Sequence, residues 1–187
     1  MAEKTASNKP VVATISLAGC FGCHMSLLDI DERIVQFIEL FELNKSPLND
    51  IKKFTKRANV GLVEGGCCNN ENVEVLRYFR ENCDVLVSVG ACAGNGGLPA
   101  LRNKLPLKEC LIEAYLESPT ADHGKALIPD DPELPKLLDR VYPCHEVVKI
   151  DYYMPGCPPS ADVFWETLSS VINGQGFDLP VELIKYD

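Results

Sequence analysis

The sequence predicts an α/β fold in which a mainly parallel β-sheet is covered by helices on both faces. Short runs of β-branched and apolar residues alternate along the chain with longer segments in which apolar residues recur at helical spacing. A glycine or proline closes each of the apolar runs, as expected where a strand ends. When strands alternate with helices, each helix forms a right-handed crossover that connects two parallel strands.

Four segments are predicted to be strands. The first is residues 11–18 (VVATISLA), which end at a glycine, and the second is residues 59–64 (NVGLVE), which end at two glycines. The third is residues 84–89 (DVLVSV), before a further glycine turn, and the fourth is residues 147–153 (VVKIDYY), before Pro-Gly. With helices between them, these strands favour a doubly wound, flavodoxin-like architecture.

Three segments are predicted to be helices. Residues 26–41 carry apolar side chains at helical spacing, and Ser26 with Asp29 fits a capping box at the start. Residues 71–83 and 161–172 are the other two predicted helices. A parallel sheet places the ends of all its strands on one edge, where such folds usually bind ligands.

Two connecting segments are polar. Residues 44–57 hold a local basic patch, which most often is simply a solvated face. Residues 118–135 contain four prolines, and a loop of this length in a compact domain is usually functional, docked or mobile. At 187 residues the chain predicts one flavodoxin-like domain over residues 11–187, preceded by a mobile N-terminal arm over residues 1–10.

Charge and composition exclude several classes of function. The formal net charge is −9, which argues against nucleic acid as a partner, because phosphate binding needs clustered Lys and Arg. No apolar run is long enough to span a bilayer, so we expect no membrane insertion. The N-terminal residues have no apolar core of a signal peptide, and we therefore expect a cytoplasmic protein.

Cysteines gather in the turns that follow the predicted strands. The chain has nine cysteines, an odd number that suits a disulfide framework poorly. Gly19-Cys20-Phe21-Gly22-Cys23 follows the first strand, Gly90-Ala91-Cys92-Ala93-Gly94 the third, and Pro155-Gly156-Cys157-Pro158-Pro159 the fourth. Four thiols on one sheet edge bind either tetrahedral zinc or an iron–sulfur cluster. A cluster is favoured, because only one pair is close in sequence; zinc, thiol–disulfide chemistry and unliganded cysteines stay open.

The other cysteines have simpler interpretations. Cys83, Cys110 and Cys144 are expected to pack as small apolar side chains. The adjacent Cys67 and Cys68 follow the second strand, and a structural or merely neighbouring role is preferred to that of alternative ligands or redox thiols.

Two further residues could act beside the thiols. Glu64 ends the second strand, either as a solvated turn residue or as a proton-transfer or second-shell group. His24 could donate a hydrogen bond to sulfur, but a helix-start residue facing solvent or a partner is slightly preferred.

Together these motifs resemble the small, electron-transferring subunit of nickel–iron hydrogenases, most closely the soluble, cytoplasmic NAD-reducing bidirectional type. The resemblance covers roughly residues 10–175 and rests on the cysteine turns above, on Glu64-Gly65 and on the Gly96-Gly97 pair. It implies a flavodoxin-like fold and one 4Fe–4S cluster proximal to the nickel–iron centre. The implied ligands are Cys20, Cys23, Cys92 and Cys157, with a role for Glu64 near the cluster.

The resemblance also implies how the work is divided among subunits. The hydrogenase large subunit supplies two CxxC motifs to nickel and iron, whereas this chain has one, so we expect no hydrogen-splitting site and no catalytic residue here. Electrons would pass between the large subunit and diaphorase subunits that carry flavin and further iron–sulfur clusters and reduce NAD. No G-x-G-x-x-G fingerprint follows a strand, so NAD should bind elsewhere.

A related family is the cluster-bearing subunit of complex I, which has a similar Pro-Gly-Cys-Pro-Pro turn. Its adjacent cysteines follow the first strand, where this chain has the spaced pair Cys20 and Cys23. The alternative function is therefore the cluster-bearing subunit of a membrane-bound hydrogenase or of a complex I-like quinone oxidoreductase.

Overall fold

The fold is built on a parallel five-stranded sheet. A computed structural model describes residues 9–122, 124–172 and 179–184. Within them the strand order is β2-β1-β3-β5-β7, and every neighbouring pair is parallel. The strands are β1 (Val11–Ser16), β2 (Glu42–Leu43), β3 (Ala58–Glu64), β5 (Cys83–Val89) and β7 (Tyr152–Met154). Taken in chain order this is the flavodoxin-like order 2-1-3-4-5, so the predicted fold class is confirmed.

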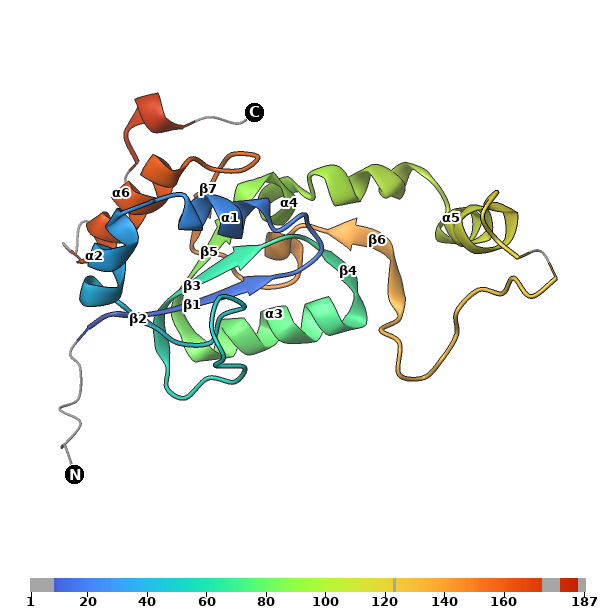
Figure 1. The fold of residues 1–187 in the computed structure, drawn as a ribbon, viewed down its shortest axis with the longest axis horizontal. Helices are drawn as coiled ribbons and strands as arrows, with labels where there is room; N and C mark the ends of the chain where they lie inside the picture. The colour runs from blue at the N-terminus through green and yellow to red at the C-terminus, as the bar shows by residue number, and fades with distance from the viewer. Residues whose placement is uncertain (1–8, 123, 173–178, 185–187) are drawn as a thin grey trace.

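Helices cover both faces of this sheet (Figure 1). One face carries α1 (Gly22–Leu28), α2 (Arg33–Leu40) and α6 (Ala161–Ile172), and α3 (Asn70–Asn82) lies on the other. The first face packs the larger apolar cluster, which includes Val12 of β1 and Phe164 of α6. The opposite cluster includes Ala13 of β1 and Phe79 of α3, as the alternation of side chains along a strand requires.

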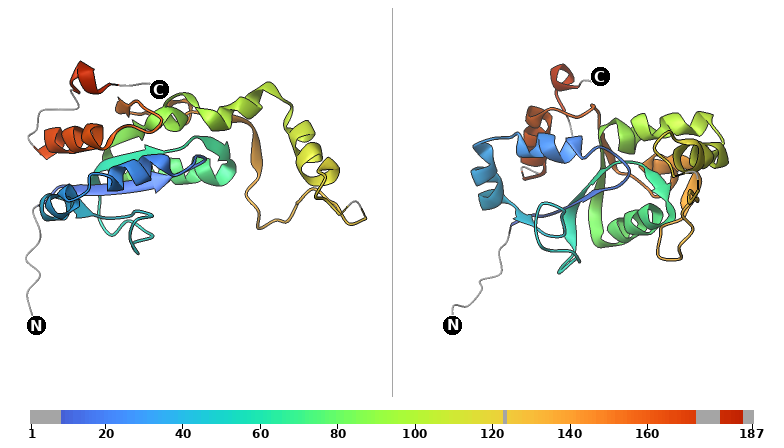
Figure 2. Two further views of the ribbon diagram at one scale, coloured as in Figure 1. Left: turned by 45° about the horizontal axis from the view of Figure 1, so that its top comes forward. Right: turned by 45° about the vertical axis from the view of Figure 1, so that its right-hand side comes forward.

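A second, two-stranded sheet extends the molecule beyond the main one. It pairs β4 (Cys67–Asn69) with β6 (Leu137–Tyr142) in antiparallel fashion. Between β5 and β6 the chain forms α4 (Gly90–Asn95), the 3-10 helix η1 (Leu98–Lys104), α5 (Leu107–Ile112) and the π-helix η2 (Glu113–Glu117). Figures 1 and 2 show that α5 and the segment before β6 project away from the main sheet. Of residues 118–135, those that the structure describes form no helix or strand, as predicted.

The predicted long helix over residues 26–41 is wrong. The segment forms two helices, and Asp31 between them has a left-handed φ of 59°. The break lets both helices turn apolar side chains toward the sheet, and Ile30, directly before it, is fully buried. The predicted capping box is also wrong: Ser26 lies inside α1, and its hydroxyl donates to the Pro159 carbonyl oxygen at 2.5 Å.

The predicted fourth strand is too long at its start. Residues 147–151 are not strand, and β7 begins at Tyr152. Asp151 explains this limit, since its carboxylate accepts the Leu86 N–H at 2.9 Å, which replaces a strand-to-strand hydrogen bond. A short 3-10 helix, η3 (Cys144–Glu146), precedes this segment, and another, η4 (Val181–Leu183), follows α6.

Parts of the predicted domain organisation lie outside the described residues. Of the N-terminal arm over residues 1–10, only residues 9 and 10 are described, and the single domain over 11–187 stays a prediction. No helix within the described ranges is both long enough and apolar enough to cross a bilayer.

Candidate functional site

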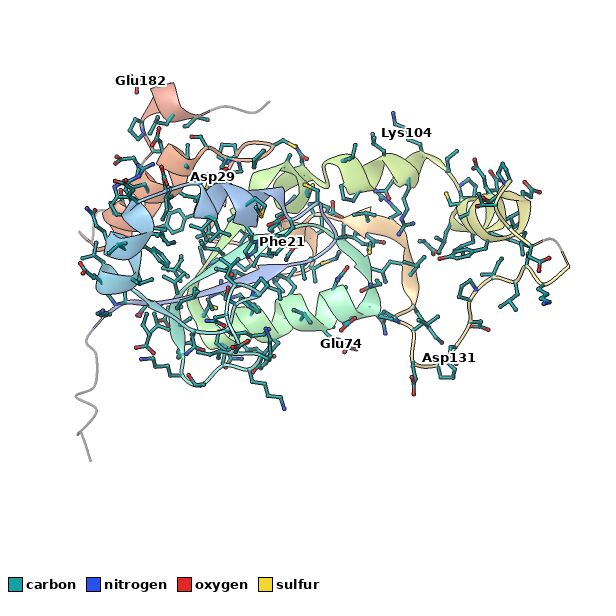
Figure 3. All side chains as sticks on the ribbon, in the orientation of Figure 1. Phe21, Asp29, Glu74, Lys104, Asp131 and Glu182 are labelled. Atoms are coloured by element: carbon teal, nitrogen blue, oxygen red, sulfur yellow. The ribbon has the colours of Figure 1, made fainter. Side chains whose placement is uncertain are left out.

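Three cysteine-bearing turns meet at the carboxyl edge of the main sheet. Cys20 and Cys23 flank the start of α1, where Phe21 takes a left-handed φ of 66°. Figure 3 labels Phe21 at this edge. Cys92 lies in α4, directly after β5, and Cys157 lies in the turn after β7. A hydrogen bond of 2.8 Å from the Ala91 N–H to the Gly156 carbonyl joins the last two turns.

The four thiols act on one another electrostatically. The pKa of the Cys23 thiol is raised, first by burial and then by Glu64 and the thiols of Cys92, Cys20 and Cys157. Burial also raises the pKa of Cys92, with smaller contributions from Cys157 and Cys20. Cys20 and Cys157 are exposed, whereas Cys23 and Cys92 are half-buried. The structure therefore brings together the four cysteines that the sequence singled out; we call them the four-thiol edge.

Glycines make room for these sulfur atoms. Gly90 has a φ of 77°, and a Cβ added there would lie 2.5 Å from the Cys23 sulfur. A Cβ on Gly97, whose φ is 46°, would lie 2.9 Å from the Cys92 sulfur. Any side chain at either position would force the thiols to move, so the edge needs glycine for space as well as for backbone conformation.

Glu64 and His24 are buried partners behind the four-thiol edge. Glu64 is 2% exposed and His24 is 4% exposed, so the solvent-facing interpretation is wrong for both residues. Glu64 Oε2 accepts the His24 backbone N–H at 3.0 Å and lies 2.5 Å from His24 Nδ1. His24 is buried because α1 begins at Gly22 and lays its first turn against β3, and Phe21 stacks on the imidazole ring.

The polar contact continues away from the edge through two hydroxyls. His24 Nε2 lies 2.9 Å from Thr14 Oγ1, which lies 2.7 Å from Ser46 Oγ. A cavity of about 10 Å³ borders Thr14, Cys23, His24 and Glu64, and this is close to the least space that one water needs. Thr14 and Ser46 were not among the predicted site residues; the available signal was a threonine in the middle of a strand whose neighbouring residues are apolar.

The remaining cysteines lie mostly in the core. Cys83 and Cys144 are fully buried, as predicted, and burial raises the pKa of Cys83 to about 12. Cys110 was also expected to pack in the core, but it is only half-buried on α5. Cys67 is fully buried and Cys68 half-buried; burial and the Cys68 thiol raise the pKa of Cys67 to about 11. The complete burial of Cys67, Cys83 and Cys144 suits a structural role.

The donor set fits a sulfur-bridged metal cluster. Thiolates are the usual ligands of 4Fe–4S clusters, and the edge supplies four of them from three separate turns. Within the part of the chain that the structure describes, no three His, Cys, Asp or Glu side chains are placed to hold a single metal ion. Two of the four thiols are exposed and two are half-buried, and glycine backbone lies beside the half-buried pair.

The parallel sheet with thiols at its carboxyl edge defines an α/β subunit of the iron–sulfur oxidoreductase class. The family model described as NADH ubiquinone oxidoreductase, 20 Kd subunit, matches residues 20–171. The chain belongs to this family and, within it, groups with the delta or small subunit of NAD-reducing nickel–iron hydrogenase.

Individual relatives support this assignment. The chain is 52% identical to the NAD-reducing hydrogenase HoxS subunit delta of Cupriavidus necator, over 94% of this chain and 85% of that protein. It is 36% identical to one subunit of the F420-non-reducing hydrogenase of Methanothermobacter thermautotrophicus, over 93% of this chain, but spans only 57% of that protein's length. A crystal structure of an NAD+-reducing NiFe hydrogenase in the H2-reduced state superposes with a TM-score of 0.93 at 46% identity, covering 96% of this chain and 100% of that one.

Proposed function

We propose that this chain, the electron-relay small subunit of an NAD-reducing nickel–iron hydrogenase, binds one 4Fe–4S cluster at its four-thiol edge. The ligands would be Cys20, Cys23, Cys92 and Cys157. The observation that carries this proposal is the convergence of these thiols, each close enough to affect the ionisation of Cys23. When bound, such a cluster supplies one-electron transfer.

A cluster explains the arrangement better than zinc does. Structural zinc sites typically use two cysteine pairs, each close in sequence. Here a single close pair, Cys20 and Cys23, combines with two remote residues from other turns. The glycines at 90 and 97 leave space beside the sulfurs that a group larger than one ion requires.

The large subunit of the hydrogenase is the proposed partner at this edge. Three apolar side chains around it are exposed: Met25 at 52%, Leu28 at 41% and Leu98 at 71%. We expect the interface to include residues 19–31, 64–68 and 90–97, and the nickel–iron centre to lie on the large subunit. Association would cover apolar surface that is costly to leave in water.

Electrons would leave toward diaphorase subunits that carry flavin and further iron–sulfur clusters. The described residues of the segment 118–135 project from the body, and this segment is a candidate contact with another subunit (Figure 2). Residues 177–187 are a second candidate contact, and of these the structure describes residues 179–184. Cytoplasmic location and the absence of nucleic-acid binding remain predictions.

Glu64 is the candidate for a proton-transfer or supporting role beside the cluster. Its carboxylate is buried and holds both the backbone and the imidazole of His24. In this position it fixes the turn that carries Cys23 and places a negative charge close to that thiol. No group on this chain is proposed to split hydrogen.

The alternative is a subunit of a membrane-bound hydrogenase or of a complex I-like quinone oxidoreductase. The name of the matched family favours it, because that family is described by a subunit of NADH ubiquinone oxidoreductase. Affinity isolation separates the two: flavin-containing diaphorase subunits should copurify with this chain, and quinone-linked membrane subunits would support the alternative.

A Cys157→Ser variant tests the cluster in the purified complex. The unaltered complex should yield about four irons and four sulfides attributable to this chain. The variant should lose that iron and hydrogen-dependent NAD reduction, whereas Cys110→Ser, on α5 away from the edge, should keep both. Zinc in place of iron, or full NAD-linked activity in Cys157→Ser, would contradict the proposal.

A further inference from the structure

A second cavity lies behind the four-thiol edge, on the α3 side of the sheet. It has a volume of about 220 Å³ and opens between α4 and the turn after β7. The α4 wall has the small residues Gly90, Ala91 and Gly94 and ends at the neutral amide of Asn95, and the other wall includes Tyr153 and Met154. The Ala91–Gly156 hydrogen bond ties the two walls together, so the cavity is a built feature rather than a gap between mobile loops.

A buried hydroxyl borders the cavity without a partner. Ser88 of β5 is 1% exposed, and its Oγ is the buried side-chain polar atom, among the described residues, that makes no hydrogen bond. Ser88 also lines the cavity, and Gly94 lies opposite, because a Cβ added there would come 3.9 Å from Ser88 Oγ. A buried hydroxyl without a hydrogen bond is unfavourable, so the site favours an occupant that supplies the missing partner.

The lining determines the chemical class of that occupant. None of the residues that line the cavity is charged, which disfavours phosphates, carboxylates and metal ions. The glycines and alanine of the α4 wall have no large side chains, and the ring of Tyr153 borders the other wall. A planar ligand therefore fits between the two walls. The volume is below that of a drug-sized site, which restricts the occupant to a fragment-sized molecule.

We propose that the cavity between α4 and β7 is a binding site for a small, neutral, planar molecule with a hydrogen-bond acceptor that pairs with Ser88. Neither Ser88 nor Gly94 is a proposed cluster ligand, although Gly90 of the same wall lies against the Cys23 sulfur. The carbonyl or hydroxyl of such a ligand would accept the Ser88 O–H, and its ring would lie along the Gly90–Gly94 wall.

Gly94 allows the site to be blocked with little disturbance. The 3.9 Å separation is ordinary van der Waals contact, and the backbone there is not left-handed, so a Cβ is tolerated. Gly94→Val would place its methyl groups in the cavity. Ser88→Ala removes the donor and leaves the cavity open, and Ser170→Ala on α6 is the control for an equivalent change elsewhere.

The test uses the purified hydrogenase complex and two probes of nearly the same shape, neutral benzamide and anionic benzoate. Saturation-transfer NMR measures their binding. We expect benzamide to bind and benzoate to bind at least tenfold more weakly. Ser88→Ala should weaken benzamide about 3–10-fold, as one hydrogen bond predicts. Gly94→Val should abolish binding, and Ser170→Ala should leave it unchanged.

Each other result overturns the proposal. Equal binding of benzamide to the unaltered protein and to Ser88→Ala would show that the hydroxyl recognises nothing. Binding of benzoate as tight as that of benzamide would show that the uncharged lining does not select a neutral ligand. Binding to the isolated chain but not to the complex would mean that a partner's side chain fills the cavity, and no binding to either would mean that water alone satisfies Ser88. If Gly94→Val fails to fold, Ser88→Ala still decides the outcome.

Discussion

Glu64 and His24 join β3 to α1 beneath the four-thiol edge. The carboxylate oxygen Oε2 of Glu64 accepts the His24 backbone N–H at 3.0 Å and lies 2.5 Å from the imidazole Nδ1. Both side chains are almost completely buried, so the contact is shielded from solvent. The Glu64 carboxylate therefore fixes the turn between Cys20 and Cys23, and it also contributes to raising the pKa of the Cys23 thiol.

Glu64→Gln should lower the pKa of the Cys23 thiol. The negative charge of Glu64 contributes to raising this pKa, and glutamine keeps the size of the side chain without the charge. Alkylation of Cys23 at a fixed, mildly alkaline pH, followed by peptide mass spectrometry on the cluster-free chain, should therefore be faster in the variant. Glu74→Gln on the exposed side of α3 (labelled in Figure 3) is the control, and an alkylation rate that is unchanged or slower in Glu64→Gln would contradict this role of Glu64.

Thr14→Val should destabilise the fold by about 1–3 kcal/mol. The hydroxyl of Thr14 contacts both His24 Nε2 and Ser46 Oγ, and valine would leave both without this buried partner. Urea unfolding measures the loss. Thr14→Ser, which keeps the hydroxyl and loses the methyl group, should retain most of the stability; a loss in Thr14→Ser as large as in Thr14→Val would contradict this role of the hydroxyl.

Gly61→Ala should destabilise the sheet by about 1–3 kcal/mol through overpacking. A Cβ on Gly61 of β3 would lie 2.6 Å from the Cys83 sulfur and 2.7 Å from Leu86 Cδ1. Cys83→Ala removes one of these clashes, so the double variant should be more stable than the sum of the two single changes predicts. Additive losses in thermal unfolding would show that Cys83 does not limit the space at Gly61.

Asp151→Asn should cost about 2 kcal/mol at neutral pH. Burial raises the pKa of Asp151, but hydrogen bonds from Arg80 and the Leu86 N–H outweigh it and hold this pKa below its usual value near 3.8. The ionised form therefore stabilises the fold above that pH, and the contribution is lost as the pH falls below it.

The matched control for Asp151 is Asp84, which pairs with Arg57 at the surface. Their side chains are 50% and 57% exposed, so Asp84→Asn should change stability by less than about 1 kcal/mol. Denaturant unfolding between pH 2 and pH 7 compares the variants. An acid-dependent loss in Asp151→Asn as steep as in the unaltered chain would refute this role for Asp151.

The four-thiol edge could be predicted from the sequence because its position depends on the topology of the sheet alone. Parallel strands end on one edge, so Cys20, Cys92 and Cys157 had to approach one another once the strands before them were assigned. The same reasoning placed Glu64 beside them. It could not show that Glu64 and His24 are buried, because that depends on how α1 docks after its first turn.

Elements that depend on tertiary contacts escaped prediction. The break at Asp31 has no proline or glycine to mark it, and apolar spacing continues across it. The strands β4 and β6 are short and far apart in sequence, so no local pattern indicates that they pair. Asp151 shortened the fourth strand through a side-chain hydrogen bond that no periodic pattern encodes.

Replacing each of the nine cysteines by serine in turn distinguishes the proposed cluster ligands from the other thiols. The purified complex would be assayed for iron and for the paramagnetic resonance signal of the reduced cluster. We predict that replacing Cys20, Cys23, Cys92 or Cys157 abolishes or alters that signal, whereas replacing any of the other five leaves about four irons per chain. Dependence of the signal on Cys67 or Cys68, or its survival without Cys157, would contradict the claim that the four-thiol edge holds the cluster.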